Sequence, residues 1–184
     1  MRHFFGRSNI WHLGSAGESI VAGHLEGLGR HHRVLHDIKI PGAWGNIDHI
    51  VLGRNGVFAL ETKNHNGRIE CNGDEWVQIK GTYRKYAGSL RNPSRQAKGN
   101  ARSLREFIEQ NRGKVFSHSR PVWVNAVLVF ANEEADLHLH KPTVHVMRPH
   151  ELCDFIRRHG SYNALSAGEV GRLEKLLARY PGMG

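Results

Sequence analysis

The sequence has little cysteine, no long apolar run and comparatively few acidic residues. Its two cysteines, Cys71 and Cys153, form no C-x-x-C pair, which excludes a disulfide framework and indicates a reducing compartment. The longest apolar runs span a few residues, whereas a membrane-spanning helix needs about 20. The first residues also contain no apolar segment of signal-peptide length. We therefore expect a cytoplasmic protein without a membrane partner.

Basic residues are in excess. The chain has 26 Lys and Arg against 17 Asp and Glu, a net charge of +9 and a pI near 10.0. Such a surface favours polyanions, of which nucleic acid is the commonest inside a cell. Charge alone leaves this open, because many basic proteins bind no specific anion. With 184 residues, 39% of them hydrophobic, we expect one domain over 1–184.

The most informative stretch is residues 46–66. Two apolar runs, 47–53 and 57–60, flank Arg54-Asn55-Gly56, and Asn-Gly between β-rich runs predicts a hairpin with a type I′ turn. Folding there brings an acid at the start of the first strand, Asp48, to the same end as Glu61. Because side chains on a strand alternate faces, Glu61 and Lys63 share one face.

Periodicity and turn residues predict the remaining elements. We expect helices over 15–29, 92–111, 149–159 and 166–180, and further strands over 33–40, 68–71, 75–80, 122–130 and 144–147. Residues 82–89 form a polar, basic stretch without a predicted strand. This order favours an α/β fold, a mixed sheet with helices on both faces.

The two acids and the lysine are suited to phosphodiester hydrolysis. Magnesium prefers hard oxygen ligands and keeps several waters, so Asp48, Glu61 and the main-chain carbonyl of Thr62 could bind it, with Mn²⁺ as a substitute. Lys63 could orient the attacking water. Glu18 and Gln96 would come from the two long helices. The alternatives are a surface Glu-x-Lys pair at a strand end and, for Glu18, a capping role in its own helix.

Five separated motifs add a family resemblance. They are Gly14-Ser-Ala-Gly17-Glu18, Asn46-Ile-Asp48-His49, residues 55–64 with Glu61-Thr-Lys63, Trp76, and Asn92-Pro93-x-x-Gln96. In this order they resemble the nuclease-related domain (NERD) family, a branch of the PD-(D/E)xK nuclease superfamily. The resemblance implies a restriction-endonuclease-like α-β-β-β-α-β core over 14–130, with 131–184 as a C-terminal strand and helices that complete the domain.

The resemblance also implies a role for each matching residue. Glu18 is the acid of the first helix, Asp48 and Glu61 are metal ligands, Lys63 is the catalytic lysine, and Gln96 is a polar residue of the second helix near the site.

Basic and aromatic residues after the hairpins are candidates for binding the nucleic-acid backbone, although a solvated surface is the alternative. They are Tyr83, Arg84, Lys85, Arg91, Arg95, Lys98 and Arg102.

Two other readings carry less weight. Asp136, His138 and His140 could share one face of a strand and act as zinc ligands. No cysteine pair accompanies them, so an exposed strand or loop with packed leucines is preferred over a zinc site. His49 should face away from Asp48 and be structural. The chain has no G-x-S-x-G, Walker or G-x-G-x-x-G motif.

The sequence thus predicts a magnesium-dependent nuclease acting on DNA, with RNA as an alternative substrate, in DNA processing or repair. The competing hypotheses are a non-catalytic nucleic-acid-binding module on a nuclease fold, and an interaction domain whose acids and lysine form a structural ion cluster.

Overall fold

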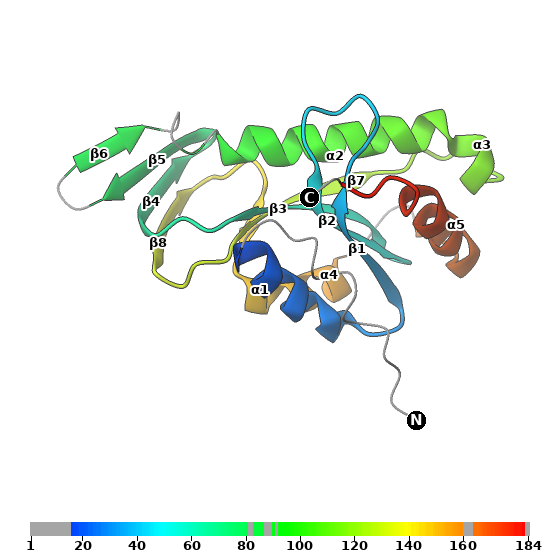
Figure 1. The fold of residues 1–184 in the computed structure, drawn as a ribbon, viewed down its shortest axis with the longest axis horizontal. Coiled ribbons are helices and arrows are strands. Elements are labelled where there is room, and N and C mark those ends of the chain that lie inside the picture. Colours follow the sequence, from blue (N-terminus) through cyan, green and yellow to red (C-terminus); the bar gives the residue numbers. More distant parts are fainter. Residues whose placement is uncertain (1–15, 81–82, 87–89, 91, 160–163, 183–184) are drawn as a thin grey trace.

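We describe a computed structural model of the chain, over residues 16–80, 83–86, 90, 92–159 and 164–182. Two mixed sheets and the helices that cover them make up the fold (Figure 1). The helices are α1 (Ala16–Leu25), η2 (Glu26–Leu28), α2 (Pro93–Gln110), α3 (Arg112–Val115), η4 (Pro149–Glu151), α4 (Leu152–Arg158) and α5 (Ala167–Leu177).

The larger sheet has the order β1-β2-β3-β7-β9. Its strands are β1 (His32–Ile38), β2 (Ile47–Gly53), β3 (Gly56–Lys63), β7 (Val124–Phe130) and β9 (His145–Met147). β1, β2 and β3 run antiparallel, whereas β7 lies parallel to β3 and β9 parallel to β7. The α1, β1, β2, β3, α2, β7 order is the predicted core, so the restriction-endonuclease-like α/β fold is confirmed.

A second sheet, absent from the prediction, has the order β6-β5-β4-β8. It contains β4 (Gly67–Asn72), β5 (Glu75–Lys80), β6 (Tyr83–Tyr86) and β8 (Ala135–His140). The β4–β5 hairpin was expected, but 83–86 pair with β5 as a strand, where the sequence predicted only a polar stretch. β8 pairs with β4, so 131–184 contribute two strands rather than one.

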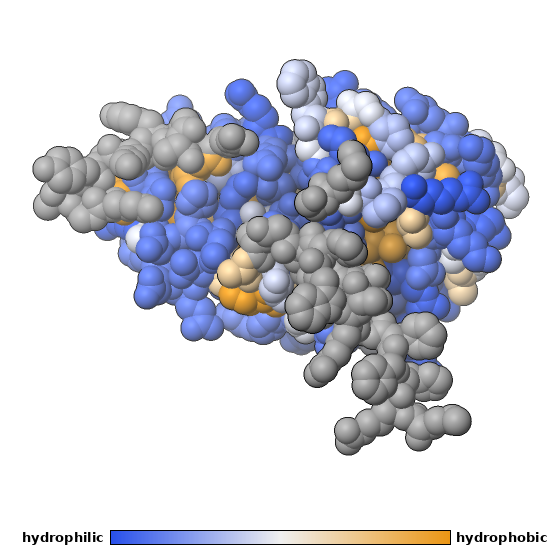
Figure 2. Space-filling model, in the orientation of Figure 1, coloured by the Kyte–Doolittle hydropathy of each residue, from blue (hydrophilic) through white to orange (hydrophobic). Residues whose placement is uncertain are grey.

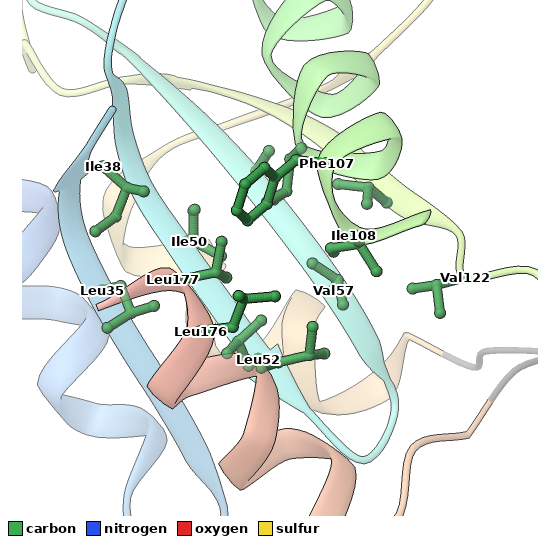
Figure 3. Close-up of a cluster of buried hydrophobic side chains, with 14 of the residues drawn as sticks. Leu35, Ile38, Ile50, Leu52, Val57, Phe107, Ile108, Val122, Leu176 and Leu177 are labelled. Atoms are coloured by element: carbon green, nitrogen blue, oxygen red, sulfur yellow. The ribbon is translucent and has the colours of Figure 1, made fainter. Parts of the chain in front are cut away.

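Two apolar layers hold the helices on the larger sheet. On one face, α2 and α5 pack through Ile108 and Leu177 onto Ile50 and other sheet residues (Figure 3). Leu104 of α2 belongs to the same buried layer. On the other face, α1 and α4 pack on the opposite side chains of the same strands. This alternation follows from the period of two along each strand.

The central hairpin forms as predicted, but its turn differs. Gly53 pairs with Gly56, so Arg54 and Asn55 are the turn residues. Neither has a positive φ, which makes the predicted type I′ turn wrong. Instead the Asn55 side chain donates to the carbonyl oxygens of Ile156 and His159. The turn is therefore held by tertiary bonds to the C-terminal segment.

The surface is mostly polar. On the face shown in Figure 2, hydrophilic residues cover most of the described surface and hydrophobic ones gather in small patches. No helix in the described part of the chain is long and apolar enough to cross a membrane.

Candidate functional site

The site begins where β2 and β3 separate. Their last paired residues are His49 and Leu60, so the next cross-strand positions are Asp48 and Glu61. The strands have diverged enough there for the Asp48 side chain to enter the gap: its Oδ2 accepts a hydrogen bond from the main-chain amide of Thr62 at 2.6 Å. The hairpin thus brings both acids together at one end, as predicted.

Glu61 and Lys63 point the same way from β3. The Lys63 Nζ lies 2.6 Å from Glu61 Oε1, and the side chains are 13% and 2% exposed. A pair so removed from water is costly unless further hydrogen bonds complete it. The structure supplies them from α2.

Two α2 side chains complete this cluster. Gln96 Oε1 accepts from Lys63 Nζ at 2.8 Å, and the Asn100 side-chain amide donates to Glu61 Oε2 at 2.8 Å. Gln96 was predicted to lie near the site, whereas Asn100 was not. The signal for Asn100 was its position four residues after Gln96, on the same helix face.

The start of α2 is fixed by the second sheet. Trp76 is fully buried and its Nε1 donates to Ser94 Oγ at 2.7 Å, while its ring lies 5.7 Å from that of Phe130. Asn92 caps the helix by accepting from the Arg95 amide at 3.1 Å. These bonds set the position of the first turn, which carries Gln96.

On the other face, α1 approaches the end of the sheet at Gly17. A Cβ at this position would lie 2.8 Å from the Cβ of Asn64 and 3.4 Å from that of Ala131. Only glycine permits this approach without displacement. It places Glu18 close enough for its charge to act on both Asp48 and Glu61. The predicted capping partner, Ser15, lies outside the described residues.

The site holds three carboxyl groups, those of Glu18, Asp48 and Glu61, against one lysine. Burial, then the Glu61 charge, raise the pKa of Asp48 to about 8, with Glu18 adding to the effect and the Thr62 amide opposing it. Burial also raises the pKa of Glu61, against the opposing influence of Lys63. Carboxylates that are desolvated and mutually repelling are typical of functional sites.

The donor set fits a hard divalent cation. Within the described residues the Asp48 carboxylate accepts a hydrogen bond only at Oδ2, from the Thr62 amide, so Oδ1 remains available as a ligand. Across those residues there is no group of three or more His, Cys, Asp or Glu side chains that could hold a metal ion. A site here would therefore consist of two carboxylates, a main-chain oxygen and water, which is a usual arrangement for Mg²⁺.

Two of the predicted backbone-binding residues, Lys98 and Arg102, lie away from this site. Lys98 follows Gln96 by two residues, a rotation of about 200° on an α-helix, so Lys98 and Arg102 lie on the flank of α2 away from the site. Both form exposed ion pairs, Lys98 with Asp74 at 2.8 Å and Arg102 with Glu106 at 2.8 Å.

The remaining members of that set are only partly located. Arg95 is exposed near the first turn of α2. Tyr83, Arg84 and Lys85 are on β6, whose side chains are not among those described, and Arg91 lies outside the described residues. Binding of nucleic acid by this set remains a prediction.

His49 is structural, as predicted. It is fully buried and its Nδ1 lies 2.8 Å from Nδ1 of His36 on β1. Burial, then the neighbouring His36, lower the pKa of His49 to about 3. The imidazole is therefore neutral and takes no part in the acidic cluster, which consists of Glu18, Asp48 and Glu61.

The zinc alternative gains no support. Residues 135–140 form β8, with His138 Nε2 2.8 Å from Asp136 Oδ2 on the exposed surface. Leu137 is partly buried, but Leu139 is 38% exposed, so only one of the two leucines packs as expected. Both cysteines are free thiols, and burial raises the pKa of Cys71 to about 11.

Comparison with known proteins agrees with the geometry. The nuclease-related domain family matches residues 13–131, which include every residue of the acidic cluster. An uncharacterized protein of Bacillus anthracis is 37% identical over 105 residues, covering 53% of this chain and 47% of that protein. The chain thus spans about half the length of this curated relative. No solved structure matches significantly. The chain belongs to the nuclease-related domain family of the PD-(D/E)xK nuclease superfamily.

Proposed function

We propose that the chain is a metal-dependent nuclease that hydrolyses phosphodiester bonds in DNA. One observation carries the proposal: Asp48, Glu61 and Lys63 converge at the open end of the β2–β3 hairpin, in a chain of nuclease-related type. The excess of carboxyl groups over lysine there supports a cation, and the net charge of +9 supports a polyanionic substrate.

Asp48, Glu61 and the main-chain carbonyl of Thr62 are the residues that would hold Mg²⁺ or Mn²⁺. When bound, such a cation neutralises charge that develops on the phosphate and lowers the pKa of an attacking water. The high pKa of Asp48 means that this carboxyl group must lose its proton before it can act as a ligand.

Lys63 would act on the phosphate and the attacking water. Its ammonium group is held by Glu61 Oε1 and Gln96 Oε1, so its position is fixed before substrate arrives. A preorganised positive charge of this kind stabilises charge that appears in the transition state without a cost of reorganisation. Gln96 and Asn100 are positioning residues, because each holds one member of the Glu61–Lys63 pair.

The test is a cleavage panel with the full chain. Single-stranded DNA, duplex DNA and RNA are incubated with Mg²⁺, with Mn²⁺ and with EDTA. We expect metal-dependent cleavage of at least one DNA form, reduced roughly 100-fold or more in Glu61→Gln and Lys63→Ala. Glu174→Gln and Lys175→Ala, on the outer side of α5, are matched controls that should cleave normally.

A second candidate is a nucleic-acid-binding module without turnover. It is favoured by the engagement of both Glu61 oxygens with Lys63 and Asn100, a closed network that could serve only to hold β3 against α2. This candidate predicts salt-dependent DNA binding with no cleavage in either metal. That result, with normal binding by Glu61→Gln, would overturn the nuclease proposal.

A further inference from the structure

A groove runs along the flank of α2 that faces away from Gln96 and Asn100. Its volume is about 520 Å³, and the side chains that give it its character are Lys98, Arg102, Arg105, Trp123, Thr143 and His145. A volume of this order suits a ligand the size of one or two nucleotides, since small-molecule sites measure roughly 300–1,000 Å³. The acidic cluster lies on the other flank of the helix.

The groove exists because β9 is short. β9 pairs with β7 only at Val127–Val129, so within the described residues the start of β7 has no strand on its outer side. Trp123 immediately precedes β7 and is 59% exposed. The guanidinium carbon of Arg105 lies 5.2 Å from the centre of the Trp123 ring. An exposed indole with an arginine over its ring combines a flat aromatic surface with a positive charge.

The charge of the groove is positive. Three basic side chains line it, and none of the residues that line it is Asp or Glu. Lys98 and Arg102 also contact Asp74 and Glu106, but these pairs are exposed to solvent. Exposed ion pairs contribute little to stability, so a phosphate could take the place of either carboxylate.

We propose that this groove binds single-stranded nucleic acid, with a base stacked on Trp123 and the adjacent phosphates on Arg105 and Arg102. An aromatic platform combined with a basic track is the usual means of holding an unpaired strand, because every base has a flat face. Duplex DNA keeps its bases stacked within the helix and would leave Trp123 without a partner. This proposal rests on the proposed function in one respect only: it takes from it that the polyanion is a nucleic acid.

Binding is measured by fluorescence anisotropy in EDTA, which separates it from cleavage. The probe is a labelled oligothymidylate of about 20 nucleotides, longer than the usual 4–16 nucleotides of one binding site. Trp123→Ala should bind about 10-fold more weakly, whereas Trp123→Phe should recover most of the loss because a phenyl ring also stacks. The control is Trp44→Ala, since Trp44 is fully exposed in the loop before β2.

The basic residues are tested by salt dependence. Arg105→Gln should reduce the slope of log affinity against log salt by about 0.7, the value for one phosphate contact on a single strand. Arg33→Gln is the control, because Arg33 is an exposed, ion-paired arginine on β1, at the opposite edge of the sheet. Bound oligothymidylate should also quench tryptophan fluorescence in Trp44→Ala but much less in Trp123→Ala.

Three results would overturn the proposal. Unchanged binding by both Trp123→Ala and Arg105→Gln would show that the groove is not used. If Trp123→Ala and Arg105→Gln weaken the binding of a duplex of the same length as much as they weaken the binding of the single strand, the ligand is the duplex backbone and not a single strand. A loss in Arg105→Gln but not in Trp123→Ala would reduce the groove to a charge patch. An oligouridylate probe distinguishes RNA from DNA. Because binding is measured in EDTA, these results can be interpreted even if the chain cleaves no nucleic acid in the nuclease assay.

Discussion

The side-chain amide of Asn100 donates to Glu61 Oε2 at 2.8 Å, across the contact between α2 and β3. Lys63 holds the other oxygen of the same carboxylate. Glu61 is therefore fixed from both sides, and its orientation depends on a helix that follows it in the chain only after β4, β5 and β6.

The Asn100 contact leads to a prediction for activity. Asn100→Ala should reduce metal-dependent cleavage by roughly 10–100-fold, the usual range for residues that orient a metal ligand. The measurement is the pH profile of cleavage, because loss of the amide should also shift the pH dependence that Glu61 imposes. Asn72→Ala, at an exposed strand end, is the control. Full activity in Asn100→Ala would show that Glu61 needs no support from α2.

A second prediction concerns the approach of α1. Gly17→Ala should lower the free energy of unfolding by about 1–3 kcal/mol, the cost of overpacking, because the new methyl group would collide with Asn64. Gly23→Ala lies on the same helix with nothing within 4 Å of the new Cβ, and should raise stability by up to about 1 kcal/mol. Urea unfolding measures both. Equal effects would mean that α1 does not pack as described.

The acidic cluster should destabilise the metal-free fold at high pH. The folded pKa of Asp48, about 8, lies above its ordinary value of 3.8, so its protonated form favours folding and this stability is lost as pH rises through the folded pKa. Asp48→Asn should therefore raise Tm in EDTA, more at pH above 8 than near pH 5. For a chain of this size ~1 kcal/mol corresponds to roughly 2–4 °C. A gain that does not depend on pH would contradict this origin.

The buried histidine pair should have the opposite pH dependence. The folded pKa of His49, about 3, lies below its ordinary value of 6.5, so the unfolded chain binds the extra proton and stability is lost as pH falls below about 6.5. His49→Gln removes this titration. The free energy of unfolding of His49→Gln should be lower than that of the wild type, and this difference should shrink by up to ~1.4 kcal/mol for each unit that the pH falls between about 6 and 4. Chemical unfolding at several pH values tests this, and a constant deficit would contradict it.

Much of the site was predictable because it depends on short-range rules. Two acids and a lysine at one end of a hairpin follow from the alternation of side chains along strands and from the turn between them. The start of α2 follows from its cap and its first-turn proline. The turn type was not predictable, because Asn55 is held by carbonyl groups from α4 and the residue after it, far away in sequence.

What the sequence by itself determined is the family, the hairpin and the shared face of Glu61 and Lys63. Only the tertiary structure decided which flank of α2 meets that hairpin. The rotation of a helix about its axis is set by how its apolar stripe packs on the sheet, and here Leu104 and Ile108 are buried against it. That rotation brings Gln96 and Asn100 to the acids and places Lys98 and Arg102 beside Trp123 instead.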